Sequence, residues 1–252
     1  MPRFSSVYER AKHQRQLLTP ETLAKRLASK LNFWYWAERL TLDSSQLVSG
    51  AKDITGNGND GVQATSANRL SFFSSDPMYG GRKSFGSTTS TGNRHLAAPA
   101  TFTCADQIFS AYYKDGIDST FDVYSSISVD TPSEEKRLLG SLNEAVLRST
   151  FSFSLTASIG GRAQSSTILP LPASVLVASS ALPPVRALQI GGSSINAGRV
   201  FVGGFRHYLV SKTTLTANEI ALIEGVISWD DVTQSRLVGN HRFRNRPTLI
   251  GD

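Results

Sequence analysis

The histidines and the cysteine of this chain do not form a metal-binding or nucleophilic pattern. His13, His95, His207 and His241 are scattered, and no pair has the spacing with which a helix or hairpin holds a metal. Cys104 stands alone, which excludes an intramolecular disulfide and a cysteine-based zinc site, so we predict a buried apolar group. The chain also lacks a phosphate-binding Gly-x-x-x-x-Gly-Lys loop and a Gly-x-Ser-x-Gly nucleophile elbow. We therefore predict no catalytic residue, no metal and no cofactor.

Oxygen-bearing side chains gather in one turn-rich segment, at Asp53, Asn57, Asn59 and Asp60. Such oxygens are the ligands that calcium prefers, and the adjacent acids at 230–231 offer two more. Asn and Asp in turns usually bond their own backbone, however, and the intervening glycines tolerate positive φ. The segment therefore predicts a tight turn, with calcium or glycan binding as the alternative.

The positive charge of this chain lies at its two ends. The net charge is +6, yet residues 31–235 hold 15 bases against 17 acids. Basic ends on a nearly neutral body predict an acidic partner: a protein surface, nucleic acid or anionic lipid, unless they serve solubility alone. We favour a protein surface, because arginine pairs bidentately with carboxylates, and segment 241–246 lacks a nucleic-acid recognition fold. The predicted partner-binding residues are Arg3, Arg10, Lys12, Arg15, Lys25, Arg26, Arg236, Arg242, Phe243, Arg244 and Arg246.

Short β-prone runs separated by Gly, Ser, Asn and Asp dominate the chain between two helical segments. A Thr-Pro-Glu start at 19–21 predicts a helix over about 20–31. Thr216 and Glu219 have capping-box spacing, which predicts a second helix ending near Trp229. The strand candidates are 32–36, 83–85, 107–113, 123–128, 136–140, 145–153, 174–178, 187–190 and 201–210. Many short strands at even spacing favour an all-β, antiparallel sandwich or a barrel.

Several segments, taken in order, carry a family resemblance. They are Phe33-Trp34-Tyr35-Trp36-Ala37-Glu38, the loop 53–60, Ala187-Leu188-Gln189-Ile190-Gly191-Gly192, Phe201-Val202-Gly203-Gly204-Phe205, Tyr208-Leu209-Val210-Ser211 and Leu215-Thr216-Ala217-Asn218-Glu219-Ile220. Together they resemble the laminin-G-like branch of the concanavalin-A-like lectin/glucanase superfamily, in the form found in tailed-phage virion proteins. The resemblance implies a jelly-roll sandwich over 33–232, preceded by a basic arm and short helix at 1–32 and followed by an extended basic arm at 233–252.

The glucanases of that superfamily place acid and nucleophile on one strand with the pattern Glu-x-Asp-x-x-Glu, which is missing here. Glu134 and Glu135 are adjacent, so on a strand they point to opposite faces, and Glu38 and Asp43 are too far apart. On these grounds we predict that the chain is not an enzyme.

Two functional hypotheses follow from the resemblance. The first is a virion component, decorating a capsid or tail and docking on neighbouring subunits through its basic arms, with a homo-oligomer left open. It would be made in the host cytoplasm, because neither a secretion signal nor a membrane-spanning apolar run is visible. The alternative is a lectin or adhesin that binds host glycans through an aromatic side chain, with Trp34, Trp36 and Tyr79 as candidates.

Overall fold

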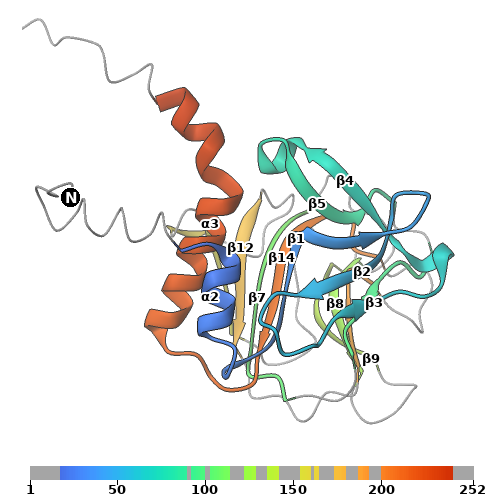
Figure 1. Ribbon diagram of the computed structural model, residues 1–252, viewed down its shortest axis with the longest axis horizontal. Coiled ribbons are helices and arrows are strands. Elements are labelled where there is room, and N and C mark those ends of the chain that lie inside the picture. Colours follow the sequence, from blue (N-terminus) through green and yellow to red (C-terminus); the bar gives the residue numbers. More distant parts are fainter. Residues whose placement is uncertain are drawn as a thin grey trace, which may run out of the picture.

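The computed structural model describes residues 18–89, 92–99, 103–113, 122–128, 135–141, 154–159, 162–164, 173–179, 187–192 and 200–240. The fold is a mostly antiparallel all-β sandwich with two α-helices packed beside it, as predicted (Figure 1). The elements are α2 (Pro20–Arg26), β1 (Leu31–Leu42), β2 (Leu47–Asp53), β3 (Gly61–Val62), η1 (Ser66–Asn68), β4 (Leu70–Asp76), η2 (Pro77–Tyr79), β5 (Arg82–Ser87), β6 (Leu96–Ala97), β7 (Asp106–Tyr113), β8 (Asp122–Ser128), β9 (Glu135–Ser141), β10 (Ser154–Ile159), β11 (Arg162–Gln164), β12 (Ser174–Ser179), β13 (Ala187–Ile190), β14 (Gly203–Ser211) and α3 (Ala217–Asn240).

Strand β1 separates two hydrophobic clusters because its side chains alternate between the faces of the sheet. Phe33 and Tyr35 enter a cluster to which neither helix contributes, and their rings stack at 4.3 Å. Trp34 points the other way, into a cluster shared with both helices. The members of this second cluster are Leu23, Ala24, Leu27, Leu31, Trp34, Ile54, Ile108, Val175, Val177, Leu209, Leu215, Ile223, Val226 and Ile227. One face of the sheet is therefore covered by α2 and α3.

Strand β14 forks the sheet. One edge pairs with β7, while the other edge pairs first with β5 and then, from His207 onward, with β1. Ladders from β5 to β4, from β4 to β2 and from β2 to β1 close a ring of five strands around the fork.

Arg206 occupies the fork itself. Against β7, Phe205 pairs with Ala111 and His207 pairs with Ser110, so Arg206 is an extra, bulged residue. A bulge breaks the alternation of side chains and re-aims them. Phe205 consequently enters the same cluster as Phe33 and Tyr35, to which neither helix contributes. Arg206 and His207 instead both contact groups on the helix-covered side.

The two helices begin where the sequence predicts and end elsewhere. The Thr19 hydroxyl caps α2 by accepting from the Thr22 amide at 3.2 Å, but α2 ends at Arg26 and strand β1 starts at Leu31. Thr216 and Glu219 form the predicted capping box at the start of α3. This helix then continues to Asn240, beyond the predicted end near Trp229, because no proline interrupts it.

Parts of the prediction lie outside the described residues. They are the strand candidate 145–153 and the arm segments 1–17 and 241–252. Residues 233–240, predicted to begin an extended arm, form helical backbone in α3. No helix of the described segments is long and apolar enough to cross a membrane.

Candidate functional site

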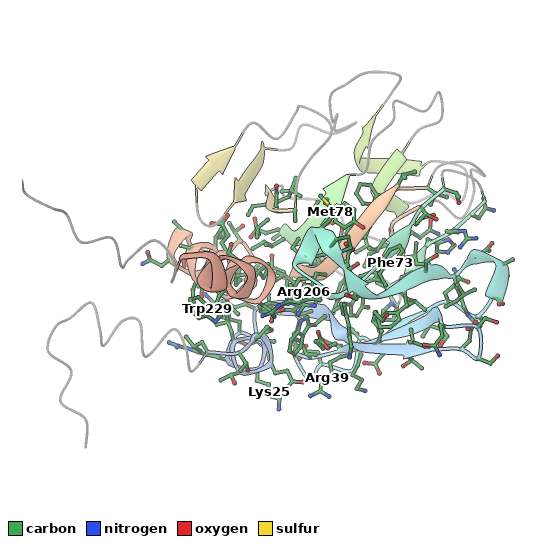
Figure 2. All side chains as sticks on the ribbon, turned by 90° about the horizontal axis from the view of Figure 1, so that it is seen from above. Lys25, Arg39, Phe73, Met78, Arg206 and Trp229 are labelled. Carbon is green, nitrogen blue, oxygen red and sulfur yellow. The ribbon has the colours of Figure 1, made fainter. Side chains whose placement is uncertain are left out.

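The side chain of Arg206 joins three elements at the fork. It is 1% exposed, and its Nη1 donates to Glu38 Oε1 of β1 at 3.2 Å and to the Lys83 carbonyl of β5 at 2.7 Å. Its Nε and Nη2 lie 2.9 and 2.6 Å from Asp230 Oδ2 of α3. Figure 2 shows Arg206 beside α3, with its nitrogens between the helix and the strands. One guanidinium thus ties both strands that share the edge of β14 to the helix above them.

Asp230 collects donors from four side chains. Besides Arg206, its Oδ2 accepts from Trp36 Nε1 and His207 Nε2, each at 3.0 Å, while Oδ1 accepts from Arg82 Nη1 at 2.8 Å. Burial alone raises the pKa of this carboxyl, but the hydrogen bond from His207 and the charges of Arg206 and Arg82 outweigh it and hold the pKa well below its ordinary value. Asp230 is therefore an ionised anchor that fixes α3 to the sheet.

His207 orients this cluster and is itself fully buried. Trp34 Nε1 lies 3.2 Å from His207 Nδ1, and an indole N–H can only donate. We therefore assign Nδ1 as the acceptor and place the proton on Nε2, which donates to Asp230. The ring of Trp36 stacks on His207, with centroids 5.9 Å apart and planes inclined by 10°. Trp36 is thereby held at both its ring face and its N–H.

Four side chains form the outer rim of this network: Trp36, Glu38, Arg82 and Lys83, here called the Trp36 rim. Trp36 is half-buried, and Lys83 Nζ pairs with Glu38 Oε2 at 3.0 Å with side chains 45% and 29% exposed. The rim combines an immobilised aromatic surface with carboxylate, ammonium and guanidinium groups that reach solvent. Ligand sites likewise place polar groups beside aromatic side chains, where the polar groups fix the orientation of the ligand.

The predicted calcium or glycan loop is a compact turn. Asp53 is buried, and its Oδ1 accepts from the amides of Trp34 and Thr55 at 3.1 and 2.9 Å. Asp60 accepts from the Asp53 amide at 2.9 Å and pairs with Lys52 at 2.7 Å. The loop carboxylates thus bond their own backbone and a neighbouring lysine. Among the residues that the structure describes, no group of three or more His, Cys, Asp or Glu side chains could hold a metal ion.

The two asparagines of the loop connect it to the start of β1. Asn57 Nδ2 donates to the Leu31 carbonyl at 2.8 Å, and Asn59 Nδ2 donates to the Asn32 carbonyl at 2.7 Å. The structure therefore brings the four predicted loop residues together and uses their polar atoms to join the turn to the α2–β1 junction.

The other predicted site residues have mixed positions. Trp34 and Tyr79 are buried, which leaves Trp36 as the aromatic candidate that reaches solvent. Lys25 and Arg26 are exposed at the end of α2, and Figure 2 shows Lys25 at the outer surface. The backbone of Arg236 belongs to α3. The remaining arm residues lie outside the described part: Arg3, Arg10, Lys12, Arg15, Arg242, Phe243, Arg244 and Arg246.

Sequence reasoning missed Arg206, Asp230, Glu38, Arg82 and Lys83 as one cluster. A signal was present in β14, where two consecutive polar residues, Arg206 and His207, interrupt a strongly apolar strand. Such a break in period 2 indicates a bulge, and bulges are frequent next to functional sites.

Comparison with known proteins relates this fold to solved sialidase structures. No family model and no curated protein matches the chain. Trypanosoma rangeli sialidase in complex with sialic acid is similar at 10% identity and a TM-score of 0.51, over 90% of this chain and 40% of that chain. The same sialidase in complex with the inhibitor DANA matches at 9% identity and a TM-score of 0.47, over 86% and 39%. The chain thus spans less than half of the sialidase, and at this identity the likeness concerns the fold.

These structures correct two predictions and leave a third open. The prediction of a phage virion component is wrong, because the structure that is similar at a TM-score of 0.51 is a sialidase and not a phage structural protein. The prediction that the chain is not an enzyme is also contradicted, because the similar fold is that of a sialidase, a carbohydrate-processing enzyme. The concanavalin-A-like jelly roll stays a prediction, because the comparisons bear out the β-sandwich and not that family.

Proposed function

We propose that this chain is a carbohydrate-binding β-sandwich of a glycan-processing protein, and that it binds sugar at the Trp36 rim. The observation that carries the proposal is the fixed, partly exposed ring of Trp36. Its ring stacks on His207, its N–H is bonded to Asp230, and the charged groups of Glu38 and Lys83 adjoin it.

The rim has the two features that a sugar requires. The apolar face of a pyranose packs on an aromatic ring, and its hydroxyls bond to carboxylate and guanidinium groups beside that ring. Because Trp36 is already immobilised, little side-chain entropy is lost on binding. The sialidase of similar fold is described in complex with sialic acid, which supports a sugar as the ligand class.

A titration of the intact chain tests the proposal. Sialic acid and galactose are added to the protein while tryptophan fluorescence and isothermal heats are recorded. We expect saturable binding of at least one sugar, a loss of binding in Trp36→Ala, and partial retention in Trp36→Phe, which keeps a ring but not the N–H.

The control variant is Val62→Ala, which removes a 56% exposed apolar side chain from β3, a strand that pairs with β2 and β6. It should bind like the unaltered chain. Absence of saturable binding to either sugar, or unchanged binding in Trp36→Ala, rejects the proposal. A fluorogenic sialoside in the same assay tests cleavage in addition to binding.

A further inference from the structure

The donors around Asp230 and the carboxylate that they bind belong to different parts of the molecule. Arg206 and His207 come from β14, Trp36 from β1 and Arg82 from β5, so these four donors are all side chains of the sandwich. The acceptor, Asp230, is on α3. The strands thus present a receptor for one carboxylate, and the helix supplies the carboxylate.

The charge balance at the fork requires an anion. On the strand side the cluster holds three cations, Arg82, Lys83 and Arg206, against one carboxylate, Glu38. Arg206 is 1% exposed, and a guanidinium that deeply buried is costly without a charged partner. If Asp230 were removed, the strands would retain the donors and an uncompensated positive charge.

Only part of α3 depends on this contact for its position. Ile223 and Ile227 are fully buried in the cluster that α2, α3 and the sheet share, and Glu219 pairs with Lys30 at 2.6 Å. The first turns are therefore held independently of Asp230. Release of Asp230 would therefore leave the start of the helix in place.

We propose that the sandwich carries a carboxylate-binding site made of Trp36, Arg82, Arg206 and His207, and that α3 closes this site with Asp230 as an internal ligand. A small organic acid, or the carboxylate of a larger ligand, binds the same donors when Asp230 is withdrawn. The inference goes beyond sugar binding, because it stands on the ion network alone and does not require a sugar at the Trp36 rim.

Removal of the internal ligand tests the site, with acetate as the probe. The full chain carrying Asp230→Ala is melted in sodium acetate and in sodium chloride of equal ionic strength at pH 7. We expect a lower melting temperature than the unaltered chain in chloride. Acetate should raise that temperature by on the order of 3 °C for each tenfold increase above its dissociation constant. The unaltered chain should respond equally to the two salts.

Asp43→Ala is the matched control. Asp43 pairs with Arg69 at 2.6 Å, with side chains 15% and 16% exposed, and it also accepts from the backbone amides of Ser45 and Leu47. It thus faces one donor side chain, whereas Asp230 faces four. Its melting temperature should fall without any preference for acetate. Equal responses of Asp230→Ala to acetate and chloride, or an acetate preference of the same size in Asp43→Ala, overturn the proposal.

Refolding yield replaces melting if Asp230→Ala does not fold in chloride. Native protein recovered in acetate but not in chloride supports the site, and no native protein in either salt overturns it. Acetate rescue is measured on a variant, whereas sugar binding is measured on the unaltered chain. Either result can fail while the other stands, so the two proposals are distinguishable.

Discussion

Arg206 of β14 and Asp230 of α3 form a buried ion pair, with 2.6 Å between Arg206 Nη2 and Asp230 Oδ2. The pair sits where the edge of β14 passes from β5 to β1, and there Arg206 also bonds the Lys83 carbonyl. A fork in a sheet interrupts the backbone ladder, and the guanidinium satisfies a carbonyl at that interruption. The same contact therefore fixes the helix, completes the sheet and positions the ring of Trp36.

Replacement of Arg206 should be strongly destabilising. Arg206→Met leaves Asp230 and Glu38 without their shared cation, and breaking a buried pair in this way costs about 3 kcal/mol. Arg206→Lys should recover little, since one ammonium cannot reproduce a fork of donors aimed at three groups. Urea unfolding measures both. Arg39→Met is the control, because its pair with Glu21 is exposed to solvent and should contribute little to the free energy of unfolding. Equal losses in the free energy of unfolding for Arg206→Met and Arg39→Met would contradict a stabilising role of the buried pair.

Gly203→Ala should disrupt the packing of β14 against β7. A Cβ at Gly203 would lie 2.0 Å from the Tyr112 carbonyl oxygen of β7 and 2.7 Å from the Phe201 ring. Because backbone cannot yield there, we expect a loss of about 3 kcal/mol in the free energy of unfolding. Gly225→Ala on α3 meets nothing within 4 Å and should instead stabilise the chain by about 1 kcal/mol. Thermal melts of the two variants should therefore shift in opposite directions; shifts of the same sign would count against the close strand packing.

The Lys30–Glu219 contact should make the free energy of unfolding depend on pH. The hydrogen bond from Lys30, together with the Thr216 amide, lowers the pKa of Glu219 from 4.5 to about 2. A carboxyl whose pKa is lower in the folded than in the unfolded state stabilises the fold above its unfolded pKa, and this stabilisation is lost as the pH falls toward the folded value. The difference in the free energy of unfolding between the unaltered chain and Glu219→Gln should thus be largest above about pH 4.5 and should disappear near pH 2.

Lys30→Met supplies the control for that titration. It should lower the free energy of unfolding of the unaltered chain. In Glu219→Gln it should cause little further loss, because the two side chains act as one pair at 2.6 Å. If the difference between the unaltered chain and Glu219→Gln stayed constant from pH 7 to pH 2, Glu219 would titrate alike in the folded and unfolded states.

Cys104 should be inert until the chain unfolds. Burial raises the pKa of its thiol to about 12, and the thiolate is the form that reacts with disulfide reagents. At pH 8 we expect no labelling of native protein and complete labelling in denaturant. Rapid labelling under native conditions would mean that the hydrophobic cluster of Phe33 and Tyr35 opens locally around Cys104.

Local signals in the sequence predicted local structure correctly. The alternation through Phe33, Trp34 and Tyr35 places neighbouring side chains in different clusters, as expected for a strand. The starts of both helices were readable because N-caps act within a few residues. Strands β2 and β4 were not predicted, since their Ser, Gly and Lys residues have weak β-propensity and tertiary pairing decides their conformation.

The candidate site could not be predicted because it depends on long-range register. Arg82, Arg206 and Asp230 meet through a bulge, a fork and the length of a helix. None of these features has a short-range signature that identifies its partner. Alternation alone places Trp34 and Trp36 on the same face, so it does not distinguish the buried ring of Trp34 from the half-buried ring of Trp36.

Pairing between β1 and β14 also governs when this protein can become native during synthesis. Leu31 lies opposite Ser211, so β14 leaves the ribosome long after the strand with which it pairs. The nascent chain must therefore carry β1 with an unpaired edge until β14 emerges, and such edges invite aggregation and chaperone binding. A product released before β14 would lack both the centre of the sheet and the arginine at its fork.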